Sequence, residues 1–339
     1  MIKPIRRTGK YWGKHTLVLL LLSLFSINVA SQNKDDADSL RSANADTARK
    51  NISIHKSSDN FYKADSIFSF RSPKGYFPSL LRNISQQAEA PFHFTGKQWI
   101  IVGASAGITI ALFQVDGEID EWARVQKQEH EWVHVLSPAI TKLGGDIGIY
   151  SVIGFGLGSA AFRNQKGVQT SLLATQAVIT SGIWARIIKL LTGRERPLAD
   201  YVNSKSESGH WYGPFAMFNQ DPAAKKSASS FDAFPSGHTA TAFSIATVFA
   251  TQYKDIKIVP IISYSLATLV GISRLTEHEH WSSDVFVGGL LGWACGKQVT
   301  SSFNKLHSDK TSSTHPKSKN KPEVTIIENG SRVGLSVRF

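Results

Sequence analysis

From Trp99 onward the sequence alternates between apolar stretches and polar turns, and this pattern constrains the fold more than any other feature. Glycine, alanine, serine and threonine are frequent inside the stretches, as is typical of helices that pack closely. The stretches cover residues 98–115, 147–162, 171–191, 239–253, 258–273 and 285–296. The sequence therefore predicts an all-α fold, a compact bundle of about six helices within a domain at residues 95–305.

The N-terminal residues 1–30 have the order of a secretory signal peptide. Five basic residues precede the apolar run Leu17–Ile27, and the small residue Ala30 follows that run. An uncleaved signal anchor is the alternative interpretation. Residues 31–94 are polar and show little periodicity, which predicts an exported segment that is extended or weakly helical. We therefore expect a protein of the cell envelope.

The formal net charge of +12 includes the five charges of the signal, so the mature chain carries +7. Residues 306–339 begin with a basic stretch rich in Ser, Thr and Pro, which is typical of a solvated linker rather than a nucleic-acid patch. Residues Val324–Phe339 alternate around Asn329-Gly330, which predicts a short C-terminal β-hairpin. The single cysteine excludes an intramolecular disulfide framework. We expect no nucleic-acid partner and infer no obligate protein partner.

Two segments place cations and backbone donors at the ends of apolar helices. Lys189 precedes Arg196 by seven residues, about two helical turns, so both side chains project from nearly the same face. Pro197 then ends the run. Further along, Ser236 and Gly237 of Pro-Ser-Gly-His stand at a helix start, where free N–H groups attract an anion. An ordinary serine cap followed by a surface histidine, His238, is the simpler interpretation of the second segment.

The third segment runs from Ser273-Arg274 to His280 and Asp284. His280 and Asp284 are four residues apart, so on a helix the carboxylate can hold the imidazole in one tautomer. An oriented neutral histidine can act as a nucleophile or a base. Arg274 adds a guanidinium that suits phosphate. His278 has no partner at a useful spacing and is expected to be a surface residue.

The three motifs together, Lys-x6-Arg-Pro, Pro-Ser-Gly-His and Ser-Arg-x5-His-x3-Asp, resemble the signature of the type 2 phosphatidic acid phosphatases (PAP2). That superfamily also contains bacterial class A acid phosphatases and vanadium haloperoxidases. Every defined motif position is matched, and the resemblance covers residues 95–300. It implies a PAP2-like helical phosphatase that needs no metal or other cofactor, and vanadate would be bound only in a haloperoxidase.

The resemblance also implies roles for individual residues. His280 would attack phosphorus to form a phosphohistidine, and Asp284 would orient it. His238 would act as the general acid that protonates the leaving oxygen and later activates water. The phosphate oxygens would be bound by the remaining motif residues, which are Lys189, Arg196, Ser236, Gly237 and Arg274.

The expected substrate is a phosphomonoester or pyrophosphate group of a lipid in a membrane, such as phosphatidic acid, phosphatidylglycerophosphate, undecaprenyl pyrophosphate or lipid A. A soluble periplasmic acid phosphatase acting on small phosphomonoesters is one alternative, and a vanadium-dependent haloperoxidase is another. The motifs do not choose among these substrates.

The membrane topology of the predicted helices has two conflicting indications. A cleaved signal followed by three crossings would put Lys189 and Pro197 in the cytoplasm. The acidic 116–131 loop and the basic 163–166 turn favour motifs that face the periplasm, by the positive-inside rule. Helices that do not cross a bilayer would remove the conflict, as would a re-entrant segment or an N-terminus that is not a cleaved signal. Integral and membrane-associated arrangements therefore both stay open.

Overall fold

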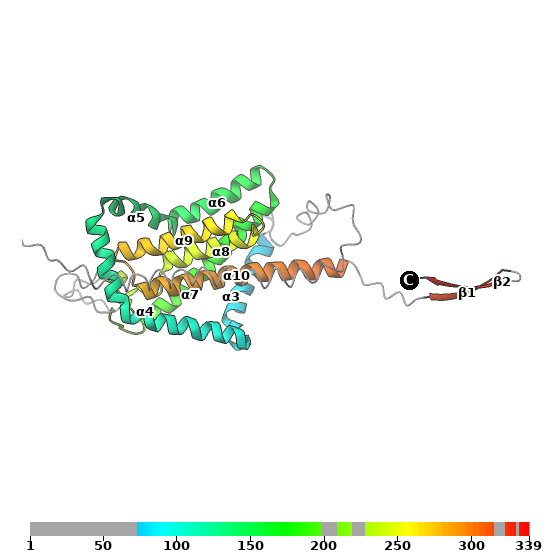
Figure 1. Cartoon of the computed structure of the whole chain (residues 1–339), viewed down its shortest axis with the longest axis horizontal. Coiled ribbons are helices and arrows are strands. Elements are labelled where there is room, and N and C mark those ends of the chain that lie inside the picture. The colour runs from blue at the N-terminus through cyan, green and yellow to red at the C-terminus, as the bar shows by residue number, and fades with distance from the viewer. Residues whose placement is uncertain (1–72, 198–208, 219–227, 315–322, 330–331, 339) are drawn as a thin grey trace, which may run out of the picture. The chain divides into compact units, whose positions relative to one another are not determined.

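Figure 1 shows the computed structural model of the chain, which describes residues 73–197, 209–218, 228–314, 323–329 and 332–338. Most of these residues are helical, which confirms the predicted all-α fold. The helices are α3 (Pro73–Glu89), α4 (Gly96–Glu129), α5 (Glu131–Leu143), α6 (Asp146–Ala161), α7 (Gln165–Thr192), α8 (Gly237–Gln252), α9 (Ile258–Thr276) and α10 (Ser282–Thr314). The predicted signal peptide, residues 1–30, lies outside the described residues, as do residues 31–72.

The bundle core is formed where α6, α7, α8 and α10 meet. Its buried side chains are aliphatic or small apart from one phenylalanine, and they are Val152, Leu173, Ala174, Ala177, Val248, Val299 and Phe303. Side-chain caps fix two of the helix starts. Asn164 accepts from the Gly167 N–H at 3.1 Å before α7, and Ser236 begins α8 in the same manner.

Glycines at every fourth position let α10 pack closely against α8. A Cβ at Gly288 would lie 2.5 Å from the Ser236 carbonyl oxygen, and a Cβ at Gly292 would lie 2.2 Å from that of Ala240. One turn further, a Cβ at Gly296 would lie 2.8 Å from the Cβ of Thr247. Because α8 carries Ser236 at its first turn and α10 follows the His280 loop, this contact brings two of the sequence motifs together.

Two helices were not predicted as apolar helices. Helix α3 falls within the segment expected to be extended or weakly helical, and Figure 1 shows it crossing the other helices. Its buried face is polar: Asn83 Nδ2 donates to Gln176 Oε1 of α7 at 2.8 Å, and Gln87 Nε2 donates to Gln298 Oε1 of α10 at 2.9 Å. Helix α5 has only 13 residues, which is too short for the apolar pattern to stand out.

The C-terminal region contains the predicted hairpin. Strands β1 (Glu323–Asn329) and β2 (Arg332–Arg338) pair antiparallel, with Glu323 opposite Arg338 and Asn329 opposite Arg332. Helix α10 continues to Thr314. The predicted boundary between the helical domain and the linker, at residues 305–306, therefore lies inside this helix.

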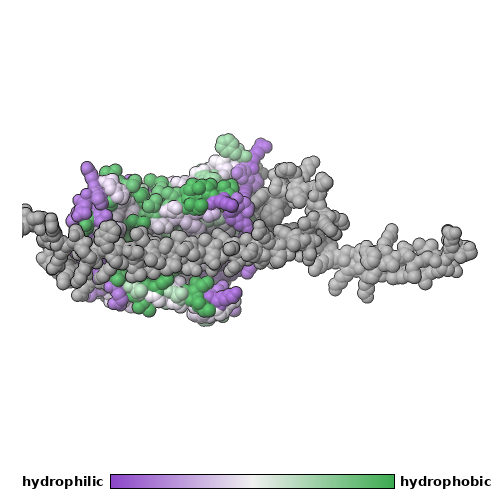
Figure 2. Space-filling model, in the orientation of Figure 1, coloured by the Kyte–Doolittle hydropathy of each residue, from purple (hydrophilic) through white to green (hydrophobic). Residues whose placement is uncertain are grey.

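Three helices are long and apolar enough to cross a membrane, namely α4, α7 and α9, and α6 is a shorter apolar helix. Figure 2 shows hydrophobic residues gathered in the middle of the visible face of the bundle, with hydrophilic residues toward both ends. Large exposed apolar side chains on α9 include Ile258, Ile261 and Leu266. A hydrophobic band of this kind is typical of a surface that lies against lipid.

The acidic segment at residues 116–131 is not a loop, and this corrects one of the two topology arguments. Helix α4 continues through it to Glu129. Two of its acids, Asp116 and Asp120, are buried and bind groups inside the bundle. Because they neutralise internal partners, their charges carry no information about the side of a membrane.

Candidate active site

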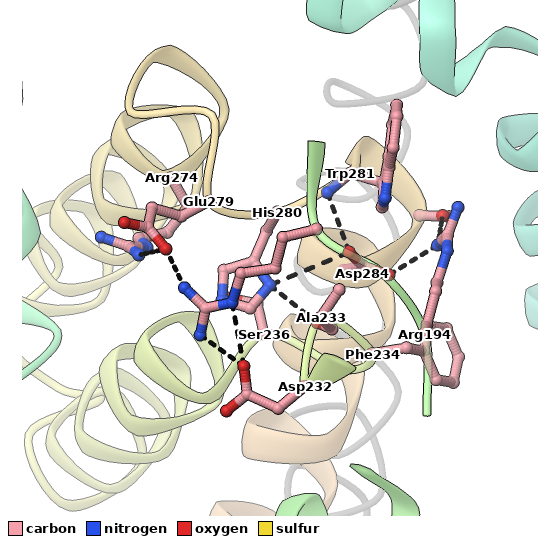
Figure 3. A network of polar contacts seen from close by, with 12 residues as sticks. Arg194, Asp232, Ala233, Phe234, Ser236, Arg274, Glu279, His280, Trp281 and Asp284 are labelled. Atoms are coloured by element: carbon pink, nitrogen blue, oxygen red, sulfur yellow. Dashed lines mark hydrogen bonds and ion pairs between the residues drawn. The ribbon is translucent and has the colours of Figure 1, made fainter. Parts of the chain in front are cut away.

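The three cations of the first and third motifs lie close together, because the carboxylates of Asp232 and Glu279 bind them. Figure 3 shows these two carboxylates. Lys189 Nζ donates to the Asp232 carbonyl oxygen at 2.5 Å. Arg196 donates to Asp232 Oδ1 from Nε at 2.9 Å and from Nη2 at 2.6 Å. Arg196 Nη1 also pairs with Glu279, whose Oε2 lies 3.6 Å from Arg274 Nη2. The structure thus brings the three predicted phosphate-binding cations together.

The His280 imidazole lies in the connection between α9 and α10 and is buried. Its Nδ1 is 2.7 Å from the carbonyl oxygen of Ala233 and 3.8 Å from Asp284 Oδ2. A carbonyl oxygen can only accept, so Nδ1 carries the hydrogen of the neutral ring and Nε2 carries the lone pair. The sequence predicted that Asp284 would hold the ring, whereas the closest hydrogen-bond acceptor is a backbone carbonyl.

Electrostatics keep the His280 ring neutral. Burial lowers the pKa of His280 well below its ordinary value, and the positive charges of Lys189, Arg196 and Arg274 lower it further. His280 lies outside the three candidate membrane-spanning helices. A neutral imidazole with a free lone pair, next to three cations, is the state that a nucleophile toward phosphorus requires.

His238 lies in the first turn of α8, and the same three cations affect the pKa of its ring. Burial lowers the pKa of His238 to about 4, and Arg274, Lys189 and Arg196 add to the effect. The turn between α5 and α6 packs against this residue, since a Cβ at Gly145 would lie 3.2 Å from His238 Nε2. Among the described residues, none hydrogen-bonds the His238 ring, which leaves both nitrogens available to another molecule.

The Pro-Ser-Gly-His segment places backbone and hydroxyl donors beside these groups. Ser236 Oγ accepts from Thr239 N at 3.4 Å and from Thr239 Oγ1 at 2.9 Å. Its own hydrogen therefore stays available to a third group. A Cβ at Gly237 would meet nothing within 4 Å, so the first turn of α8 opens onto free space. Ser236 is buried and Gly237 is half-buried, and both stand at the helix start where the sequence predicted an anion site.

A buried arginine within Lys-x6-Arg-Pro completes the polar network. Arg194 Nη1 donates to Asp284 Oδ1 at 2.6 Å, and its Nη2 donates to Asp116 Oδ2 at 2.7 Å. Its guanidinium lies over aromatic rings, 4.8 Å from the Trp211 centroid and 5.0 Å from that of Phe113. Asp284 therefore pairs mainly with an arginine and, through Oδ2, with the Trp281 N–H at 2.8 Å.

Among known protein families, the PAP2 superfamily matches this chain over residues 170–308. The match confirms the resemblance that the motifs indicated, and residues 170–308 are hereafter called the PAP2 domain. All eight predicted site residues lie within this range. Helix α4, which supplies Asp116, precedes it.

Several curated relatives are similar to part of this chain. The lipid A 1-phosphatase of Porphyromonas gingivalis is 40% identical over 67 residues, which are 20% of this chain and 15% of the relative. The probable diacylglycerol pyrophosphate phosphatase 1 of Schizosaccharomyces pombe is 34% identical, over 19% of this chain and 27% of the relative. Lipid phosphate phosphatase 1 of Arabidopsis thaliana is 31% identical, over 34% and 39%. The chain spans less than half the length of each of these relatives.

Two solved structures also match. LpxE of Aquifex aeolicus has a TM-score of 0.38 and 23% identity, covering 53% of this chain and 93% of that one. A transmembrane PAP2-type phosphatidylglycerolphosphate phosphatase of Bacillus subtilis has a TM-score of 0.39 and 21% identity, covering 68% and 95%.

Some residues around the PAP2 site were not found from the sequence. His278, expected at the surface without a partner, is buried and its Nδ1 lies 3.0 Å from Asp120 Oδ1. Arg194 occupies an undefined position of the Lys-x6-Arg-Pro motif, and its acidic partner Asp116 is 78 residues away in sequence. Asp232 lies three residues before the Pro-Ser-Gly-His motif. This proximity was the one signal in the sequence that could have identified Asp232 as a site residue.

The polar insertion at residues 198–234, which the sequence predicts to be a loop or lid, is described in part. Trp211 pairs with Arg194 through an isolated bridge and stacks on its guanidinium. Tyr212 Oη lies 3.3 Å from Glu195 Oε2. These lid residues therefore pack against the segment between Lys189 and Arg196. Among the described residues, no group of three or more His, Cys, Asp or Glu side chains is placed to hold a metal ion, and a cofactor-free reaction stays a prediction.

Proposed function

We propose that this chain hydrolyses a phosphomonoester or pyrophosphate group of a lipid through a phosphohistidine on His280. The observation that carries this proposal is the convergence of three cations around a buried, neutral histidine whose Nε2 bears the lone pair. The names of the curated relatives support a lipid phosphate as the substrate class. Phosphoryl transfer depends mainly on positioning and charge stabilisation, which such a cluster supplies.

In the first step, the Nε2 lone pair of His280 forms a bond to phosphorus. The bond between phosphorus and the leaving oxygen breaks, and His238 donates a proton to that oxygen. Lys189, Arg196 and Arg274 stabilise the negative charge on the other oxygens, together with the Ser236 hydroxyl and the Gly237 N–H. The incoming phosphate adds negative charge beside His238, which raises its pKa and supplies the protonated acid that this step needs.

In the second step, a water molecule attacks the phosphorus of phosphohistidine. His238, now neutral, takes the proton of that water, and the electrons of the N–P bond return to His280. Inorganic phosphate then leaves, and both histidines regain their starting states. The same residue thus serves as acid and then as base, as microscopic reversibility requires.

We further propose that the protein is exported and embedded in a membrane of the cell envelope, with its active site facing the periplasm. The three long apolar helices and the hydrophobic band in Figure 2 support the membrane location. The basic and apolar N-terminus supports export. Retention of the full chain in the pellet after carbonate extraction is expected, and release into the supernatant would contradict integral insertion.

The activity is tested with the purified full chain in detergent. Phosphate release is measured on phosphatidic acid, phosphatidylglycerophosphate, undecaprenyl pyrophosphate, lipid A and a water-soluble phosphomonoester. Replacement of His280 by alanine is expected to abolish release, whereas His134→Ala, at an exposed histidine of α5, is expected to leave it unchanged. Turnover close to that of the wild type in His280→Ala would contradict the proposal.

A further inference from the structure

The loop that carries His280 is held from outside the PAP2 domain. This loop, residues 277–281, connects α9 to α10, and α10 begins at Ser282. One side of the imidazole is fixed by the Ala233 carbonyl. That single contact leaves the backbone on either side of His280 to be held by other groups.

Asp116 of α4 accepts four hydrogen bonds, and three of them come from the start of α10. Its Oδ1 accepts from Ser282 Oγ at 2.6 Å and from the Ser283 N–H at 2.9 Å. Its Oδ2 accepts from Ser283 Oγ at 2.5 Å and from Arg194 Nη2 at 2.7 Å. The carboxylate is fully buried and acts as a cap supplied by another helix, because it binds a first-turn N–H group of α10.

Arg194 links this cap to Asp284. Its Nη1 donates to Ser283 Oγ at 2.6 Å and to Asp284 Oδ1 at 2.6 Å. Asp284 Oδ2 in turn accepts from the Trp281 N–H, next to the nucleophile, at 2.8 Å. A continuous chain of short contacts therefore runs from Asp116 to the residue that follows His280.

Asp120, one helical turn after Asp116, binds the other side of the loop. Its Oδ1 lies 3.0 Å from His278 Nδ1. Helix α4 thus contacts the chain two residues before His280 and again two residues after it. Asp116 makes no hydrogen bond or ion pair with Lys189, Arg196 or Arg274, whose carboxylate partners are Asp232 and Glu279.

We propose that Asp116 is a positioning residue for the nucleophile: through Ser282, Ser283 and the Arg194–Asp284 pair it fixes the His280 loop in register with the phosphate-binding cations. Asp120 assists it through His278. This inference rests on the proposed phosphatase function. The catalytic step in the PAP2 domain then depends on a carboxylate from the preceding helix, whereas phosphate binding does not.

The test compares Asp116→Asn with Glu121→Gln, a matched control at an exposed acid of the same helix. Each full-length variant is measured in detergent on the best substrate of the wild type, for kcat, for KM and for inhibition by inorganic phosphate. In Asp116→Asn we expect kcat to fall about 10- to 100-fold, because a small misplacement of a reacting group has that cost. KM and the inhibition constant of inorganic phosphate should stay within about twofold, since Asp116 touches none of the phosphate-binding groups.

Ser283→Ala provides a gentler second variant, because removal of one partner from a buried ion pair can prevent folding. It deletes one donor to Asp116 and is expected to lower kcat by a smaller factor with KM unchanged. An unchanged kcat in folded Asp116→Asn would overturn the inference. So would equal losses in kcat and in phosphate affinity, which indicate general disorder of the site. If Asp116→Asn does not fold, an unchanged kcat in Ser283→Ala overturns it. Absence of phosphate release by the wild type would instead contradict the proposed function itself.

Discussion

The imidazole of His280 is oriented by the backbone carbonyl of Ala233, 2.7 Å from Nδ1, and more distantly by the Asp284 carboxylate at 3.8 Å. Ala233 stands three residues before Ser236, in the segment that leads into α8. The tautomer of the nucleophile is therefore fixed by the same segment that supplies the helix-start donors. Asp284 contributes to the site mainly through its pairs with Arg194 and the Trp281 N–H.

Replacement of Asp284 by asparagine should leave the tautomer of His280 unchanged. The Ala233 carbonyl still requires a hydrogen on Nδ1, because a carbonyl cannot donate. Activity should fall nonetheless, since Arg194 loses its ion pair with the Asp284 carboxylate. Two-dimensional 1H–15N NMR of the histidine rings in detergent micelles reports the tautomer. A shift of the hydrogen to Nε2 in Asp284→Asn would show that the carboxylate, and not the carbonyl, sets it.

Replacement of Glu279 by glutamine should tighten the binding of inorganic phosphate. The Glu279 carboxylate pairs with Arg196 and Arg274, so an incoming phosphate competes with it for both guanidinium groups. Loss of that charge is expected to lower the inhibition constant of inorganic phosphate by about two- to fivefold, which is the scale of a partly exposed ion pair. Glu131→Gln, at an exposed acid of α5, is the control. Weaker phosphate binding in Glu279→Gln would mean that the carboxylate supports the site instead of competing for it.

Acidification should destabilise the protein partly through His238. The pKa of His238 is lowered to about 4 in the folded chain, while the unfolded value is near 6.5, so unfolding takes up a proton between these pH values. The free energy of unfolding therefore falls as the pH falls through this window. Thermal unfolding in detergent at pH 7 and pH 5 checks this. The drop in Tm should be smaller in His238→Asn than in the wild type, and an equal drop in both would contradict the lowered pKa.

Replacement of Gly292 by alanine should destabilise the contact between α8 and α10. The added Cβ would lie 2.2 Å from the Ala240 carbonyl oxygen, a backbone atom that can move only with its helix. We expect a cost of about 1–3 kcal/mol, as is typical of overpacking. Gly182→Ala on α7 is the matched control, because a Cβ there meets nothing within 4 Å. Equal thermal stability of the two variants would show that the helices separate more easily than their packing indicates.

The sequence predicted the parts of this protein in which local patterns carry the information. The motif cations and His280 stand at the ends of apolar runs, so their convergence at one end of the bundle followed from the helix pattern. Helix α3 was not predicted from the sequence because its buried contacts join amide side chains, as in Asn83 with Gln176. Such contacts leave no apolar stripe along the helix. The role of Asp116 could not be predicted from the sequence for a different reason. Its partner Arg194 lies 78 residues away, and only the packed fold shows that the two charges meet.

The central claim is tested most directly by isolating the phosphorylated enzyme. The wild type is mixed with a lipid substrate labelled with phosphorus-32, quenched within the first turnover, and digested for peptide mapping. We predict label on the peptide that contains His280, stable in base and lost in acid as expected of an N–P bond, and no label in His280→Ala. Turnover of the wild type without label on His280, or with label on another residue, would contradict the phosphohistidine mechanism.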